Sequence, residues 1–120
     1  MQIKLFKPYK TGNEIKYISD IIDNGLDMSG DGVYTKKVQK LMEQRYGVSK
    51  VLLTTSGTTA LEMAIRLLNL KKGDEVIAPS FTFSSTINAI LMSQGAKVVF
   101  AEIKSDTLNI DPLDIERKIT

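Results

Sequence analysis

The chain has 120 residues, 42% hydrophobic and 25% charged, which is typical of one small globular domain. It contains no Cys and no His, which excludes thiolate nucleophiles, disulfides, Ser–His relays and the usual zinc sites within these residues, so no metal site is expected. The net charge is +2 with both signs interspersed, so neither a nucleic-acid nor a membrane partner is expected. The chain lacks a signal-peptide pattern and a membrane-span pattern, which favours a cytoplasmic location.

A first helix is predicted after Thr11, because Thr11 and Glu14 have the T-x-x-E spacing of a capping box. Apolar residues then recur at helical spacing until Asn24-Gly25 ends the pattern: Ile15, Ile18 and Ile22. The following loop contains Gly30-Asp31-Gly32, which can adopt backbone angles closed to other residues. Such a loop can pass close to a ligand, or it can simply connect two helices.

A second helix is predicted to begin at Thr35 as its cap and to end at Gly47. Its apolar face would consist of Val38, Leu41, Met42 and Tyr46. A short strand is then predicted at about residues 50–54.

The stretch VLLTTSGTTAL, residues 51–61, joins that strand to a third helix through a turn of hydroxyl residues and one glycine. Thr59 and Glu62 have capping-box spacing, which places the helix start at about Thr59 and directs free N–H groups toward residues 56–59. Such a turn can bind a phosphate, or it can merely cap the helix. It lacks the glycine patterns of ATP and NAD sites.

The third helix is predicted to continue to about Asn69 with three residues facing inward: Leu61, Ile65 and Leu68. A turn at residues 72–74 precedes a strand at residues 75–78, which Pro79 ends. Residues 80–86, SFTFSST, lead into a fourth helix that stops at Gly95 and has three inward residues: Ile87, Ile90 and Leu91. A third strand is predicted at residues 96–101.

Asp111-Pro112 opens the last predicted helix, with Asp111 as its cap and Pro112 at the first helical position. Strands that alternate with helices predict the α/β class with a parallel sheet. The two small-residue turns, at residues 56 and 81, would then leave the same edge of the sheet, where such folds bind ligands. Because a three-stranded parallel sheet leaves edges and faces uncovered, we expect the chain to be the front of something longer.

Several segments, in the same order and spacing, resemble the DegT/DnrJ/EryC1/StrS sugar aminotransferases: GDGVYT (30–35), EQRYG (43–47), KVLLTTSGTTALEMA (50–64), GDEVIAPSFTFSSTINAI (73–90), GAKVVF (95–100) and DTLNID (106–111). The resemblance implies the N-terminal part of a pyridoxal-phosphate (PLP)-dependent transferase fold type I large domain, incomplete at the C-terminus. Residues 1–120 would supply N-terminal helices and the first half of the PLP-binding large domain, without the rest of that domain or the small domain.

The resemblance also implies an activity, amino transfer from glutamate to a nucleotide-linked keto sugar in surface polysaccharide or antigen biosynthesis, carried out by a homodimer. The implied substrate is dTDP-4-keto-6-deoxy-D-glucose, converted to dTDP-4-amino-4,6-dideoxy-D-galactose. The positions that match the family's phosphate-binding residues are Gly57, Thr58 and Thr59. Phe83 matches the aromatic residue that stacks on the cofactor ring, although its pattern alone would indicate a core residue. The positions expected near the sugar nucleotide are Gly30, Asp31, Gly32, Thr35, Ser85 and Asn88.

One departure from the family is an absence. The Schiff-base lysine and the carboxylate that pairs with the pyridine nitrogen fall beyond Thr120 in the resemblance, so no catalytic residue is expected in this chain, and the 120 residues alone are expected to be inactive. Three alternatives stay open: a PLP-dependent sugar dehydratase of the same family with histidine in place of the lysine, a non-catalytic module that binds a phosphorylated ligand, and a structural pseudo-subunit.

Overall fold

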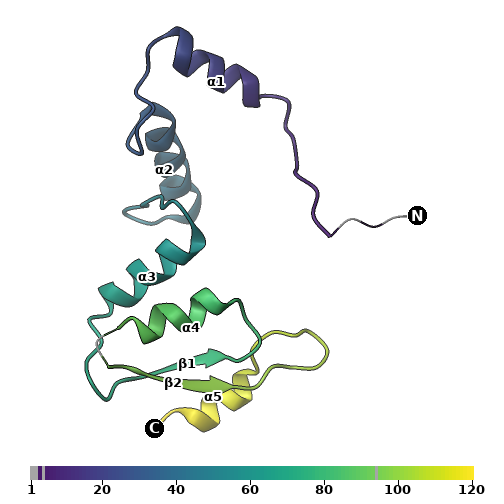
Figure 1. Ribbon diagram of the computed structural model, residues 1–120, viewed down its shortest axis with the longest axis vertical. Helices are drawn as coiled ribbons and strands as arrows, with labels where there is room; N and C mark the ends of the chain where they lie inside the picture. Colours follow the sequence, from purple (N-terminus) through teal and green to yellow (C-terminus); the bar gives the residue numbers. More distant parts are fainter. Residues whose placement is uncertain (1–2, 4, 94) are drawn as a thin grey trace. The chain divides into compact units, whose positions relative to one another are not determined.

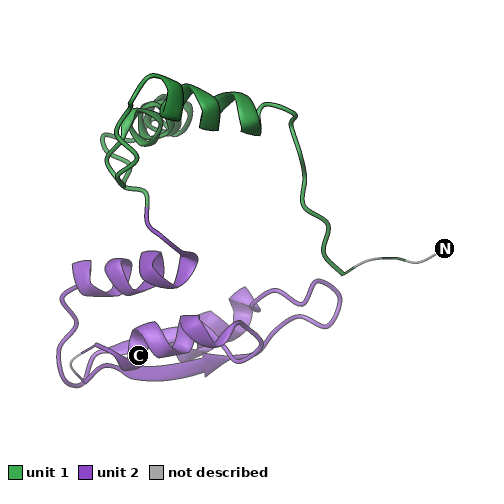
Figure 2. Ribbon diagram, turned by 45° about the horizontal axis from the view of Figure 1, so that its top comes forward, with its two compact units in different colours: residues 1–53 green, residues 54–120 purple. Residues whose placement is uncertain are grey.

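A computed structural model of the chain describes residues 3, 5–93 and 95–120. The chain divides into two compact units, residues 1–53 and residues 54–120 (Figure 2). Across the described ranges, no helix has both the length and the apolar character that a membrane crossing requires.

Unit 1 contains two helices, α1 (Glu14–Asp23) and α2 (Val33–Tyr46). Only half of the predicted capping box forms: the Glu14 carboxylate accepts the Thr11 N–H at 2.7 Å, but the residue before α1 is Asn13, so Thr11 is not the cap. The two helices are joined by Tyr34, whose hydroxyl donates to the Asp20 carboxylate at 2.6 Å. This hydrogen bond raises the pKa of Tyr34 to about 12, because loss of the proton would place two negative charges together.

The second helix begins earlier than its sequence suggests. Gly32 occupies the cap position, so Thr35 is the third residue of α2 and the prediction that it caps the helix is wrong. Glycine suits the cap because a Cβ there would lie 2.3 Å from the Asp27 carbonyl oxygen. The predicted end is confirmed, since Gly47 adopts a left-handed conformation with φ 64°.

Unit 2 contains α3 (Gly57–Leu67), β1 (Glu75–Pro79), α4 (Ser84–Leu91), β2 (Lys97–Ala101) and α5 (Pro112–Lys118). β1 and β2 are parallel, and Pro79 lies beside Ala101 at their carboxyl ends. α4 and α5 appear on opposite sides of the strands in the view of Figure 1. The core consists of Ala78, Ile90 and Ala96, with Ile65, Leu70, Val76, Ile87 and Val98 packed against it. The predicted α/β class with parallel strands is confirmed.

Several other predictions, in both units, fail for a shared reason. The described residues form no strand at residues 50–54, because a strand requires a neighbour to complete its hydrogen bonds and β1 and β2 pair only with each other. Three residues predicted to face inward are exposed: Leu61, Leu68 and Leu91. Of the predicted face of α2, Val38, Leu41 and Tyr46 are exposed as well. No element among the described residues covers these faces.

Candidate functional site

The turn before α3 differs in detail from its prediction. The helix begins at Gly57, two residues earlier than expected, because Ser56 and not Thr59 is the cap. Ser56 has extended backbone angles, and its hydroxyl accepts the Thr59 N–H at 3.1 Å. The Thr59 hydroxyl lies 3.0 Å from the Ser56 hydroxyl. The three predicted residues Gly57, Thr58 and Thr59 therefore form the first turn of α3.

Two backbone donors in this first turn are free. The N–H groups of Gly57 and Thr58 have no hydrogen-bond partner among the described residues. All four residues from Ser56 to Thr59 are exposed to solvent. An added Cβ at Gly57 would meet no atom within 4 Å, so space next to these donors is open.

This arrangement suits an anion. Free N–H groups at a helix start carry partial positive charge, to which the helix dipole adds about +0.5 charge, and nearby hydroxyls supply further donors. A phosphate ester is therefore a fitting ligand, although the turn presents no charged side chain. The described residues contain no group of three or more Asp or Glu that could hold a metal ion.

Phe83 lies between β1 and α4, at the cap position of α4, with extended backbone angles. Its side chain is 75% exposed, so it is not a core residue in the described chain. The first turns of α3 and α4 lie at the same end of unit 2 as the arrowheads of β1 and β2 (Figure 1). The turn at residue 81 leaves the carboxyl end of β1, whereas the turn at residue 56 follows no strand among the described residues, so the prediction that both leave the edge of one sheet is met only for the first.

Two residues of α4 that are predicted to lie near the sugar nucleotide, Ser85 and Asn88, differ in their access to solvent. Asn88 is exposed, whereas Ser85 is only 9% exposed and faces the packed side of the helix. Asn88 is therefore open to a ligand and Ser85 is not. A hollow of about 440 Å³ lies between α3 and α4, but none of the predicted site residues lines it.

The predicted substrate loop belongs to unit 1. Gly30 and Asp31 are exposed, Gly32 is buried and Thr35 is half-buried. The Asp31 carboxylate pairs with the Lys36 ammonium at 3.2 Å. The loop is shaped by Asp27, whose carboxylate accepts the N–H and hydroxyl of Ser29, each at 2.8 Å. The hydrogen bonds from Ser29 hold the pKa of Asp27 below its usual range.

Two parallel strands, and helix starts at the same end of the unit as their carboxyl ends, make unit 2 an α/β unit, a class of fold that binds ligands at that end. Residues 8–120 match the model of the DegT/DnrJ/EryC1/StrS aminotransferase family, and the chain belongs to that family. It is 37% identical over 117 residues to a GDP-perosamine synthase of Vibrio cholerae, a match that covers 98% of this chain and 31% of that protein. It is 35% identical over 118 residues to EpsN of Bacillus subtilis, called a putative pyridoxal phosphate-dependent aminotransferase, covering 98% of this chain and 30% of that protein.

Solved structures agree in fold. A GDP-4-keto-6-deoxymannose-3-dehydratase with a trapped PLP-glutamate geminal diamine superposes with a TM-score of 0.85 at 28% identity, over 99% of this chain and 32% of that one. The PLP form of the putative sugar aminotransferase Spr1654 from Streptococcus pneumoniae gives 0.82 at 30% identity, over 100% and 30%. The chain therefore spans about a third of the length of the relatives it matches.

Proposed function

We propose that the first turn of α3 holds the phosphate of pyridoxal 5'-phosphate. The observation that carries this proposal is the pair of free N–H groups on Gly57 and Thr58, in a turn exposed to solvent. Family membership adds support, because similar solved structures are named as PLP-bound proteins. The Thr58 and Thr59 hydroxyls would add donors, and Phe83 would lie against the flat face of the cofactor ring.

Bound PLP supplies an electron sink for bonds to an amino-bearing carbon. The residues of this chain bind and orient the cofactor, whereas the lysine that the reaction requires and the carboxylate beside the ring nitrogen come from residues outside these 120. In this proposal, residues 1–120 contribute N-terminal helices and the first half of the PLP-binding large domain. Alone they would bind the cofactor phosphate without catalysing amino transfer.

For the whole enzyme we propose amino transfer from glutamate to a nucleotide-linked keto sugar, in a cytoplasmic homodimer that serves polysaccharide biosynthesis. One relative in Bacillus subtilis, named 3-oxo-glucose-6-phosphate:glutamate aminotransferase, supports glutamate as the donor and a keto sugar as the acceptor. The nucleotide is a finer question. The dTDP-linked substrate expected from the sequence has a parallel in a dTDP-sugar 4-aminotransferase of Saccharopolyspora spinosa, but the Vibrio cholerae relative is a GDP-perosamine synthase. We propose the nucleoside-diphosphate 4-keto-6-deoxy sugars as the class.

Sugar dehydration is the second candidate. It is favoured by the fold match to two GDP-4-keto-6-deoxymannose-3-dehydratase structures, at TM-scores of 0.83 and 0.85. The two candidates predict different residues at the position that reacts with the cofactor, lysine for amino transfer and histidine for dehydration. The coding sequence beyond Thr120 decides between them. An enzyme with lysine there should transfer nitrogen from glutamate to a GDP- or dTDP-linked keto sugar.

The phosphate site can be tested on the 120-residue chain itself. Titration with PLP, followed by amide chemical shifts in NMR, should move the Gly57 and Thr58 signals. Pyridoxal, which has the same ring without the phosphate, is the matched control and should leave them in place. Equal shifts with both compounds, or no shift with PLP, would contradict the proposed site.

A further inference from the structure

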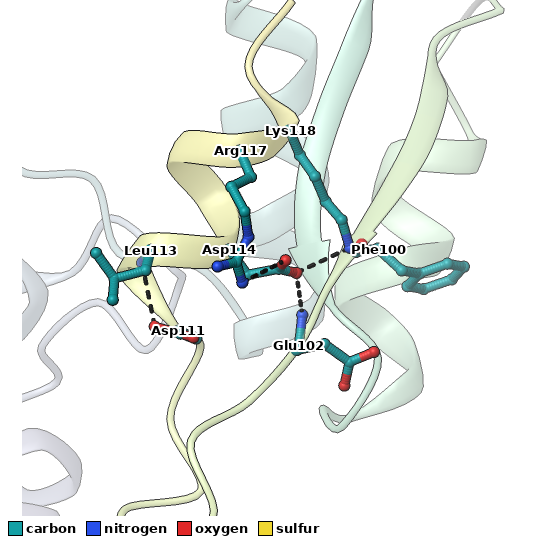
Figure 3. A network of polar contacts seen from close by, with 7 residues as sticks. All are labelled: Phe100, Glu102, Asp111, Leu113, Asp114, Arg117 and Lys118. Carbon is teal, nitrogen blue, oxygen red and sulfur yellow. Dashed lines mark hydrogen bonds and ion pairs between the residues drawn. The ribbon is translucent and has the colours of Figure 1, made fainter.

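Asp114 is a buried carboxylate that the proposed function does not use. It lies on α5, is only 6% exposed, and receives three donors (Figure 3). Its Oδ2 atom accepts the Glu102 backbone N–H at 2.7 Å and lies 2.8 Å from the Lys118 ammonium. Its Oδ1 atom accepts from the Arg117 guanidinium at 3.1 Å. These three partners offset the unfavourable free energy of burying the charge. Removal of any one of them would leave part of that cost uncompensated and would destabilise the folded chain.

Glu102, the residue directly after β2, is held on both sides of its backbone. Its N–H donates to Asp114, and its carbonyl accepts the Asp111 N–H at 2.8 Å. Ile103 and Ile110 form an antiparallel bridge inside the loop. Residues 102–111 are therefore a closed loop whose two ends meet at Glu102.

The closed loop begins directly beyond the carboxyl end of β2. Because Pro79 pairs with Ala101, Ser80 and Glu102 are the first residues beyond the carboxyl ends of the two strands. This is the edge at which parallel sheets bind ligands, and the segment that leads to Phe83 leaves from it. We propose that Asp114 is a charge latch that fastens the 102–111 loop and α5 to this edge, and that neutralisation of its carboxylate weakens its hold on Glu102.

The charges around Asp114 keep the latch closed. Lys118 and Arg117 face it from its own helix, and Lys118 also donates to the Phe100 carbonyl of β2. The Glu102 carboxylate points away from Asp114 in Figure 3, and Asp111 accepts the Leu113 N–H instead. The Lys118 ammonium, followed by the Glu102 N–H, lowers the pKa of Asp114 to about 2. The latch therefore stays closed at neutral pH, independently of whether PLP binds.

Amide hydrogen exchange of the full chain tests the latch at a single atom. Asp114→Ala removes the acceptor of the Glu102 N–H, so exchange at Glu102 should accelerate at least about tenfold while the β1–β2 ladder stays protected. Asp114→Asn should give a smaller acceleration, because its amide oxygen can still accept this bond but the charge is lost. Glu116→Ala is the matched control, since Glu116 is an exposed carboxylate on the same helix outside the network, and it should change nothing at Glu102.

Two results would overturn the proposal. One is equal acceleration at Glu102 in the Glu116→Ala protein, and the other is loss of protection throughout the β1–β2 ladder in the Asp114→Ala protein, which would make Asp114 a general support of the unit. The unsubstituted chain provides a second measurement that does not depend on a variant. The Asp114 carboxyl carbon, followed by NMR, should titrate below the ordinary value of 3.8, and a midpoint at or above 3.8 would contradict the latch.

Discussion

The starts of α3 and α5 are both capped by a side-chain oxygen, but they differ in whether backbone N–H groups remain free. In each, a side-chain oxygen caps the helix: Ser56 accepts the Thr59 N–H and Asp111 accepts the Leu113 N–H, both at 3.1 Å. At α5 the first residue is Pro112, which has no N–H, and the Asp114 N–H donates to the Asp111 carbonyl. Every donor in the first turn of α5 is therefore absent or satisfied within the chain.

At α3 the first residue is Gly57, which keeps its N–H, and neither it nor Thr58 has a partner among the described residues. The difference teaches that a capping signature alone does not distinguish a structural helix start from a binding one. What distinguishes them is whether donors remain after the cap has formed, and whether solvent reaches them. By this criterion α5 contributes to stability and α3 has the capacity to bind an anion.

The largest expected effect is a loss of stability in acid, caused by protonation of the Asp114 carboxylate on α5. The pKa of Asp114 in the folded chain is about 2, below its ordinary value of 3.8. A lowered pKa contributes stability that is fully present above pH 3.8 and is lost as the pH falls toward 2. We expect the free energy of unfolding, measured with denaturant at a series of pH values, to fall over this window. Asp114→Asn should be less stable at neutral pH and should lose this part of the acid dependence, whereas Glu116→Gln should keep it.

Replacement of Gly57 by proline would convert the start of α3 into one like that of α5. The substitution suits the backbone, because proline is favoured at the first helical position and the preceding Ser56 has extended angles of φ −160° and ψ 162°. It removes one free N–H, so phosphate or PLP binding should weaken by about 1.5 to 3 kcal/mol, the usual contribution of a hydrogen bond to a charged group. Isothermal titration would measure this change.

Gly57→Ala is the control for that substitution. It keeps the N–H and meets no atom within 4 Å, so the fold should tolerate it and the donor to phosphate should be retained. If Gly57→Pro and Gly57→Ala weakened binding equally, the free N–H would not be the reason for binding.

The features that local chemistry determines could be read from the sequence. Asp111-Pro112 predicted the start of α5, Gly47 predicted the end of α2, and both are confirmed by the structure. The predicted start of α3 lies two residues after the observed one, because the T-x-x-E spacing at Thr59 competes with a serine three residues earlier. Only the extended backbone of Ser56 decides between these caps, and that conformation depends on how the chain enters the turn.

Features that depend on distant partners were not predictable. The strand expected at residues 50–54 needs a neighbour that the described residues do not supply, and Leu61 and Leu68 need a layer to cover them. In the sequence, Asp114 is an ordinary acidic residue in the first turn of a predicted helix. Nothing in the sequence indicates its bond to Glu102, twelve positions earlier.

Removal of the two capping side chains should have a smaller effect, and it compares the two helix starts by the same substitution. Ser56→Ala and Asp111→Ala each remove one side-chain acceptor, so each should lower the free energy of unfolding by about 1 kcal/mol. The two should differ in binding. Ser56→Ala should also alter PLP affinity, since it frees the Thr59 N–H in the proposed phosphate site, whereas Asp111→Ala should leave that affinity unchanged. Denaturant unfolding and PLP titration of both variants would check this, and equal effects on affinity would remove the distinction between the two helix starts.

The smallest expected effect comes from Phe83, and it distinguishes the contribution of the cofactor ring to binding from that of the phosphate. Phe83 is 75% exposed and Phe81 is 64% exposed, so replacing either by leucine should change the stability of the chain by less than about 0.5 kcal/mol. Only Phe83→Leu should weaken PLP binding, by about 0.5 to 1.5 kcal/mol, because it removes aromatic stacking and leaves the α3 donors intact. Inorganic phosphate has no ring to stack, so its affinity should be the same in both variants. If Phe83→Leu weakened phosphate and PLP alike, Phe83 would be shaping the anion-binding turn and would not be contacting the ring.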